Sequence, residues 1–378
     1  TEFHTIPDSA DNATLRIYEN VEGELVLKQS EPGVWLASIA VADIDNDGDP
    51  DLILSGFDDH IPHSSPALAY IGSPAMYYYV NDGSGTFAKK TLLIFDNKGG
   101  GSGAIRLADF DGRDGTGDGD LDIFVTGFTG TEIGETLPQS SLLSNTNSAF
   151  VVNQPPFAPT GLEAIVDTTH SVRLVWDSAT DPNGPASFTY TLRVGTPAWP
   201  NAIRSGAEPV GPGALGYVRE AWLTGLEDGV YTWAVQAVDP GWKRSAFSMD
   251  AEFIIDTTPP VVAGILGDTL GVNTEGSLLL NIDFDDELTG VDTTAAATEK
   301  IVVTISLPGE SEQVVRFERW SPGFVWVGSV NVSVSRFLSE PITVCIDGVH
   351  DVRGNTMPYT TFSADLHFPK TTITALYG

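Results

Sequence analysis

The fold of this chain is decided by the stretch Asp43-Ile44-Asp45-Asn46-Asp47-Gly48-Asp49-Pro50-Asp51. Five carboxylates within nine residues would repel one another strongly unless a cation lay among them. In an oxygen-ligand calcium loop, carboxylates at positions 1, 3 and 5 converge on the ion, a glycine at position 6 permits a sharp turn, and position 7 donates a backbone carbonyl. These positions are filled here by Asp43, Asp45, Asp47, Gly48 and Asp49.

The residues on either side distinguish this loop from an EF-hand. Asp51 closes the loop at position 9, and the apolar run 52–54 follows it, where an EF-hand would need a helix and a bidentate Glu at position 12. Another apolar run, 38–42, precedes the loop. We therefore predict a strand, a calcium loop and a second strand. The predicted side-chain ligands are Asp43, Asp45, Asp47 and Asp51, and the predicted carbonyl donor is Asp49.

The acidic loop is repeated later in the chain. An apolar run leads into a second group of acids at 104–111, and another apolar run leaves it at 118–125. A glycine-rich insertion at 112–117 separates the two halves, so the ligand register stays open and Asp114 is an alternative ligand. The candidate ligands of this second calcium ion are Asp109, Asp111, Asp118, Asp120 and Asp122.

These segments resemble FG-GAP/VCBS repeats, which form the calcium-loop blades of integrin-type β-propellers. The resemblance covers about residues 12–150 and implies four-stranded blades of about 60 residues with calcium in a loop between two strands. A closed propeller needs at least four blades, whereas this chain supplies two and a stray strand expected at 142–152. We therefore expect another element to cover the open sheet edges and faces.

Alternation of apolar and polar residues predicts an all-β fold for the whole chain, with a short helix near 294–300. Turn-forming Gly, Asn and Asp residues separate the expected strands. These strands are 15–18, 24–27, 38–42, 52–54, 76–80, 87–93, 104–108, 121–125, 278–284, 300–305, 313–317, 324–332 and 341–346.

Two proline-containing linkers, 153–159 and 256–260, divide the chain into three predicted domains. After the first linker, 171–176 and 229–239 resemble core strands of a fibronectin type III domain, with Trp176 between the sheets and Tyr231 at the tyrosine corner. In the last domain, 351–355 resembles the D-x-x-G-N turn of bacterial Ig-like domains. The predicted domains are FG-GAP/VCBS calcium-binding repeats at 1–152, a fibronectin type III-like sandwich at 153–256 and an Ig-like sandwich at 257–378.

The net charge restricts the kinds of partner that the protein can bind. A formal net charge of -32, from 51 acids and 19 bases, argues against binding to nucleic acid or to an anionic membrane surface, because phosphates would be repelled. No apolar run approaches the length of about 18 residues that membrane insertion requires. The chain opens on Thr1 without a charged and apolar leader, as expected for a processed protein that is secreted, extracellular or displayed at a cell surface.

Three further groups of residues have alternative interpretations. The imidazoles of His60 and His63 are suitable ligands for a transition metal, although the proline between them favours an ordinary polar turn. Trp199 and the run 77–79 carry aromatic rings that suit sugars, but alternation places at least part of the tyrosine run in the core. A third cation site or an ordinary acidic surface is expected from Asp283, Asp285, Asp286, Glu287 and Asp292.

Catalytic motifs are missing from the sequence: it has no G-x-S-x-G elbow, no H-E-x-x-H and no P-loop. We therefore expect a non-enzymatic, calcium-stiffened structural protein that self-assembles into a surface polymer or filament through open blade edges. The first alternative is a cell-surface adhesin that binds a glycan or a protein. The second is a carbohydrate-active hydrolase that uses two of the many acids.

Overall fold

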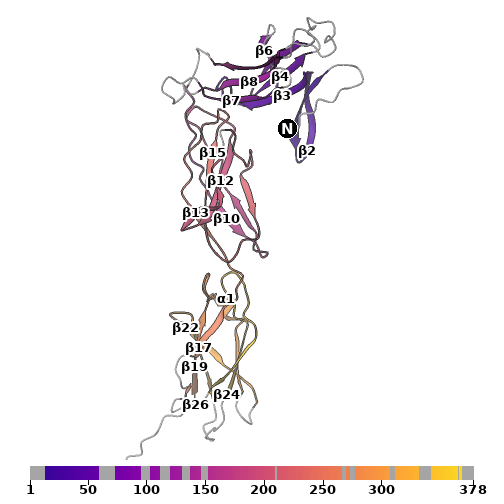
Figure 1. Cartoon of the computed structure of the whole chain (residues 1–378). Helices are drawn as coiled ribbons and strands as arrows, with labels where there is room; N and C mark the ends of the chain where they lie inside the picture. The colour runs from indigo at the N-terminus through magenta and orange to yellow at the C-terminus, as the bar shows by residue number, and fades with distance from the viewer. Residues whose placement is uncertain are drawn as a thin grey trace, which may run out of the picture. The chain divides into compact units, whose positions relative to one another are not determined.

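A computed structural model shows that the protein is all-β (Figure 1). It describes residues 13–58, 73–94, 103–110, 120–129, 137–145, 152–208, 211–265, 270–272, 277–306, 311–331, 342–364 and 366–367. The strands of these residues form several open sheets, and none of the sheets closes into a barrel. Among the same residues, no helix has the length and apolarity needed to cross a bilayer.

The chain divides into two compact units. One unit contains Thr1–Ile165, Arg173–Trp222 and Thr232–Ala251. The other contains Val166–Val172, Leu223–Tyr231 and Glu252–Gly378.

The first unit opens with three antiparallel groups of strands. β1 (Thr14–Val21) and β2 (Glu24–Pro32) form a hairpin. A four-stranded sheet follows in chain order, with β3 (Trp35–Ala42), β4 (Asp51–Asp58), β5 (Ser73–Asn81) and β6 (Phe87–Ile94). A three-stranded sheet contains β7 (Ile105–Ala108), β8 (Asp122–Thr129) and β9 (Leu137–Leu143). Each strand that the sequence predicts between residues 15 and 125 is therefore confirmed, and most are longer than predicted.

The strand expected at 142–152 is misplaced. β9 ends at Leu143, and residues 146–151 lie outside the described part of the chain. The strand stops because the backbone N–H of Asn145 leaves the sheet and donates to the carboxylate of Asp122 (2.8 Å). A side chain thus takes the place of a strand partner at this position.

β4 is buried along its whole length because side chains cover both faces of its sheet. Ile53 belongs to a core cluster with Leu107 and Ile123 of the β7–β9 sheet. Leu52 belongs to another cluster, which includes Ile17 of the β1–β2 hairpin. The hairpin and the second sheet therefore cover the two faces that the sequence left open.

The tyrosine run confirms this two-sided burial. Tyr78 belongs to the cluster of Ile53, while Tyr77 and Tyr79 belong to the cluster of Leu52, as alternation along a strand requires. All three tyrosines are buried, so their rings are not available to a sugar. The predicted core role of this run is confirmed, and the sugar-binding alternative is wrong for these residues.

Two further sheets have the arrangement of a β-sandwich. One has the order β10 (Glu163–Val166), β11 (Val172–Val175), β14 (Glu220–Leu223). The other has the order β13 (Trp199–Ser205), β12 (Thr189–Thr196), β15 (Gly229–Val238), β16 (Ala251–Ile255).

The aromatic residues of this region confirm two predictions. Trp176 is buried, and its ring centroid lies 5.6 Å from that of Tyr190 and 6.4 Å from that of Trp233. The hydroxyl of Tyr231 donates to the backbone carbonyl of Glu227 (2.7 Å). This hydrogen bond is the one that a tyrosine corner requires, so the role predicted for Tyr231 is confirmed.

The last region contains two more sheets. The larger one consists of β17 (Val261–Ile265), β18 (Leu270–Val272), β19 (Ser277–Asp285), β22 (Arg316–Ser321), β23 (Val325–Asn331) and β26 (Leu366–His367). The smaller one consists of β20 (Val302–Ser306), β21 (Gln313–Val314), β24 (Ile342–Asp347) and β25 (Thr360–Ala364).

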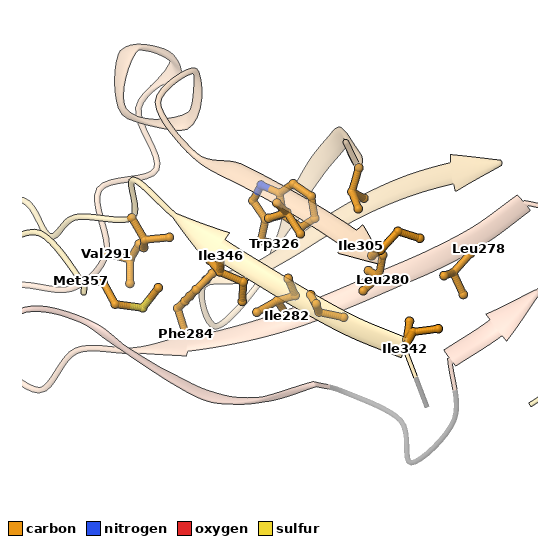
Figure 2. Close-up of a cluster of buried hydrophobic side chains, with 14 residues drawn as sticks. Leu278, Leu280, Ile282, Phe284, Val291, Ile305, Trp326, Ile342, Ile346 and Met357 are labelled. Atoms are coloured by element: carbon orange, nitrogen blue, oxygen red, sulfur yellow. The ribbon is translucent and has the colours of Figure 1, made fainter. Parts of the chain in front are cut away.

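A single core joins these two sheets (Figure 2). Leu280 and Ile282 of β19 pack with Ile305 of β20 and Ile346 of β24, and all four side chains are fully buried. The predicted helix is also present as α1 (Ala295–Thr298), which is capped by the Thr294 side chain.

Candidate metal centres

The acidic loop brings three of its carboxylates together. Asp43, Asp45 and Asp51 each offer one oxygen, and the three oxygens lie within 4.8 Å of one another. The antiparallel pairing of Ala42 with Asp51 closes the loop at its base, so the first and last ligand positions meet. This is the strand, loop and strand arrangement that the sequence predicts.

Asp51 is fixed by three donors. Its Oδ2 accepts hydrogen bonds from the backbone N–H of Ile44 (3.1 Å) and from the hydroxyl of Tyr78 (2.7 Å). Its Oδ1 accepts from the backbone N–H of Asn81 (2.9 Å). The side chain is fully buried, so this carboxylate holds β4, β5 and the loop together.

Asp43 organises the turn of the loop. Its Oδ1 accepts from the backbone N–H of Asp47 (3.1 Å), and its Oδ2 accepts from that of Gly48 (2.9 Å). Asp45 differs, because its Oδ1 is buried and has no hydrogen-bond partner. A buried carboxylate oxygen without a donor is costly, and a cation would supply the missing interaction.

The electrostatics of the loop also favour a bound cation. Burial raises the pKa of Asp43 to about 7 and that of Asp51 to about 6. Burial, together with the charge of Asp47, also raises the pKa of Asp45. A donor set made only of oxygens suits hard cations, and a cation among these carboxylates would keep them ionised at neutral pH. The residues therefore fit a metal centre.

Two predicted residues lie outside this group of three. Asp47 is exposed, and its Oδ1 accepts from the backbone N–H of Asp49 (3.0 Å). The role of Asp47 as a ligand and the role of the Asp49 carbonyl stay predictions.

The second acidic segment repeats the geometry of the first. Asp122 is fully buried and accepts hydrogen bonds from the backbone N–H groups of Phe110 (2.7 Å) and Asn145 (2.8 Å). Ile44 and Asn81 make the same pair of hydrogen bonds to Asp51. The predicted repeat is thus visible in the hydrogen bonding of the two acidic segments.

The other candidate ligands of the second segment are only partly described. Asp120 is buried, and Asp109 forms an ion pair with the Lys243 ammonium group (3.6 Å). Asp111 and Asp118 lie outside the described residues, as does the alternative ligand Asp114.

A further cluster combines Asp256, Asp286 and Asp351, whose oxygens also lie within 4.8 Å of one another. Asp256 and Asp351 are buried. Oδ2 of Asp256 accepts from the Thr289 hydroxyl (2.6 Å), and Oδ1 of Asp351 accepts from the backbone N–H of Asn355 (2.9 Å). Oδ2 of Asp286 is buried without a hydrogen-bond partner, so these residues also fit a metal centre.

The sequence identified only one member of this cluster. Asp286 was grouped with acids near it in the chain, whereas the structure groups it with two acids that sequence reasoning did not propose as ligands. The available signals were the positions of Asp256, which opens a linker, and of Asp351, which opens the D-x-x-G-N turn. One member of the predicted group, Asp292, instead lies 3.8 Å from the imidazole of His350.

Of the remaining candidates, His60 and His63 lie outside the described residues. Trp199 lies in β13 and is 70% exposed, so its ring is available to a ligand.

Replacement of Gly48 by alanine is expected to destabilise the first unit by about 2 kcal/mol more than replacement of Gly23. Both glycines have left-handed backbones, with φ of 98° and 93°. A Cβ on Gly48 would lie 2.5 Å from the carbonyl oxygen of Pro185, whereas a Cβ on Gly23 would meet no atom within 4 Å. Calorimetric unfolding of the two variants checks this prediction, and equal losses of stability would contradict it.

No protein-family model matches the chain. No curated protein matches it either. Among solved structures, the FN1–FN3 domains of chicken CNTN1 are 15% identical, cover 58% of this chain and 70% of that chain, and give a TM-score of 0.30. Chitinase ChiA74 from Bacillus thuringiensis is 16% identical, with 58% of this chain and 30% of the chitinase covered and a TM-score of 0.21.

Proposed function

We propose that this chain is a non-enzymatic, extracellular structural protein that bound Ca²⁺ stiffens. The proposal is carried by the convergence of Asp43, Asp45 and Asp51, in which one buried oxygen of Asp45 lacks a hydrogen-bond partner. Among hard cations, Ca²⁺ accepts irregular oxygen cages of this kind more readily than Mg²⁺, which demands nearly ideal octahedral geometry.

In this proposal, residues 1–152 form two blades of the FG-GAP/VCBS type, and the two sandwich domains span 153–256 and 257–378. The matching hydrogen bonds of Asp51 and Asp122 support the assignment, because they place each acidic segment between two paired strands. One Ca²⁺ ion is assigned to the first loop and a second ion to the segment that contains Asp109 and Asp122. The cluster around Asp256 is assigned a third.

The role of these ions is mechanical. With free calcium near its dissociation constant, as is common for extracellular modules, each ion would add only about 0.5–1.5 kcal/mol to the free energy of unfolding. Such a gain suits permanent stiffening of loops better than sensing. At Asp256, an ion would also hold the linker 256–260 against the turn that starts at Asp351.

Thermal unfolding with calcium and with a chelator tests the proposal. We expect calcium to raise the unfolding temperature of the wild-type protein, and the Asp45→Asn variant to lose part of this gain. Asp82→Asn is the matched control, because Asp82 lies on an exposed turn and outside the cluster. Unfolding temperatures that do not respond to calcium would contradict the proposed function.

Self-assembly is proposed through the edges of the four-stranded sheet β3–β6. Among the described strands, β3 and β6 are the outer strands of their sheet, and an outer strand can pair with a strand from a second copy. Electron microscopy and light scattering of the purified protein test this part of the proposal. A monodisperse monomer with and without calcium would exclude the polymer.

An adhesin is the second candidate function, and it is favoured by Trp199. A large aromatic ring that is 70% exposed is suited to stacking on a sugar. A glycan array probed with the wild type and with Trp199→Ala separates the two functions, because only an adhesin gives signals that the variant loses. A hydrolase would instead show turnover that one acid-to-amide change abolishes.

A further inference from the structure

A small pocket of about 30 Å³ lies beside the acidic loop, against two turns of the neighbouring sandwich. Such a volume holds one ion or one to two waters. Its lining includes carboxylates from the loop and from the two turns. The lining acids are Asp43, Asp47, Asp181 and Asp239, and the lining amides belong to Asn46, Asn153 and Asn183.

Two of these carboxylates have a buried oxygen that accepts no hydrogen bond. Asp239 is only 3% exposed, its Oδ1 accepts from the backbone N–H of Lys243 (2.8 Å), and its Oδ2 has no hydrogen-bond partner. Oδ1 of Asp181 accepts from the backbone N–H of Asn183 (2.7 Å), and its Oδ2 is likewise buried without a partner. A buried carboxylate oxygen without a partner is unfavourable, and a cation would supply the missing interaction.

The turn that contains Asp239 has the same hydrogen bonds as the turn that contains Asp351. The backbone N–H of Asp239 donates to Lys243 and that of Asp351 to Asn355, both at 3.1 Å. In each turn the later residue returns a backbone N–H to Oδ1 of the aspartate, at 2.8 Å and 2.9 Å. The chain therefore uses one turn design twice, each time with a buried aspartate.

The second acid is repeated as well. Asp286 partners Asp351 and has one oxygen bound by backbone N–H groups and one buried oxygen without a partner, as Asp181 does. Asp256, from the linker 256–260, belongs to the cluster with Asp286 and Asp351. Asn153, from the linker 153–159, lines the pocket with Asp181 and Asp239. The pocket is thus a second copy of a cluster whose oxygens already have metal-binding spacing, with an amide in place of one carboxylate.

The backbone holds the acidic loop against this pocket. The N–H of Asp43 donates to the carbonyl of Pro240 (2.9 Å), and the N–H of Ser187 donates to the carbonyl of Gly48 (3.4 Å). The nearby ammonium group of Lys243 lies 3.6 Å from the carboxylate of Asp109 and is therefore engaged elsewhere.

We propose that this pocket binds a hard divalent cation, with Asp181 and Asp239 as carboxylate ligands, and that the ion locks the acidic loop onto the sandwich. This site is distinct from the one formed by Asp43, Asp45 and Asp51. It goes beyond the proposed function, because neither Asp181 nor Asp239 belongs to the acidic loop.

Counting bound calcium ions in matched variants tests this proposal. The variants are Asp181→Asn with Asp239→Asn in the pocket, and Asp45→Asn in the loop. Equilibrium dialysis with Ca²⁺ alone, at about 5 mM so that weak extracellular-type sites fill, gives the ratio of bound calcium to protein. We expect the pocket variant to bind one ion fewer than the wild type, the loop variant to lose a different ion, and the combination to lose both.

A pocket variant that binds as many ions as the wild type would overturn the proposal and assign the space to water or to a shared proton. A loop variant that keeps the wild-type ratio while the pocket variant loses an ion would instead count against the proposed loop site. Both amide changes remove buried negative charge and preserve side-chain shape, so the variants are expected to fold, as circular dichroism would show. If the double change prevents folding, Asp181→Asn alone is titrated with Ca²⁺ and is expected to bind that ion about tenfold more weakly than the wild type, because one ligand is lost.

Discussion

Replacement of Asp51 by alanine is expected to lower the free energy of unfolding of the first unit by about 3–5 kcal/mol. The carboxylate is fully buried and accepts hydrogen bonds from Ile44, Tyr78 and Asn81. Its removal leaves three buried donors unpaired, each at a cost of about 1–3 kcal/mol, which neighbouring groups and water offset in part. The same change removes one corner of the proposed calcium site.

Scanning calorimetry measures this loss, because it can resolve the transitions of separate parts of a chain. Asp82→Ala is the matched control, since Asp82 is exposed and accepts only from residues of its own turn. Asp122→Ala is the parallel test in the second segment, where two backbone donors would lose their partner. An Asp51→Ala variant no less stable than the Asp82→Ala control would contradict this account.

In the presence of a chelator, the first unit is expected to be more stable at about pH 5 than at about pH 8. Burial raises the pKa of Asp43 to about 7 and that of Asp51 to about 6, so the folded state retains protons that the unfolded state releases. The stability is therefore highest in acid and falls as the pH rises from about 4 to about 7. Each pKa unit corresponds to about 1.4 kcal/mol, so the two groups together are worth several kcal/mol.

Calcium is expected to reduce this pH dependence, because the ion binds only the ionised carboxylates. Thermal unfolding between about pH 5 and pH 8, with chelator and with calcium, checks both statements. The Asp43→Asn variant is the control, since an amide does not titrate and the chelator curve should become less steep, with the contribution of Asp51 retained. A wild-type protein whose stability in chelator rises towards pH 8 would show that the carboxylates of the loop are not strained by burial.

Local patterns were sufficient to predict several elements. The spacing of Asp43, Asp45 and Asp51 predicted a closed loop between two strands, because the first and last positions of such a loop must meet. The tyrosine hydrogen bond at Tyr231 and the short helix at Ala295–Thr298 were also predicted. In each case the deciding contact lies within a few residues in the chain.

Contacts between distant segments could not be predicted in this way. The sequence predicted that another element would cover the open sheet faces, but it did not show that the β1–β2 hairpin and the β7–β9 sheet bury the two faces of β4. The oxygens of Asp256, Asp286 and Asp351 come together although the three residues lie far apart in the chain. Asp181 and Asp239 line one pocket although they lie far apart in the chain, and neither has a sequence motif that predicts a ligand.

Calorimetric titration of chelator-treated protein with Ca²⁺, compared between the wild type and Asp45→Asn, tests the central claim most directly. The account predicts saturable binding of more than one ion by the wild type and the loss of one ion in the variant. Heats of dilution alone up to about 10 mM calcium, which is about tenfold above the weakest dissociation constants typical of extracellular sites, would contradict it, as would identical titrations of the two proteins.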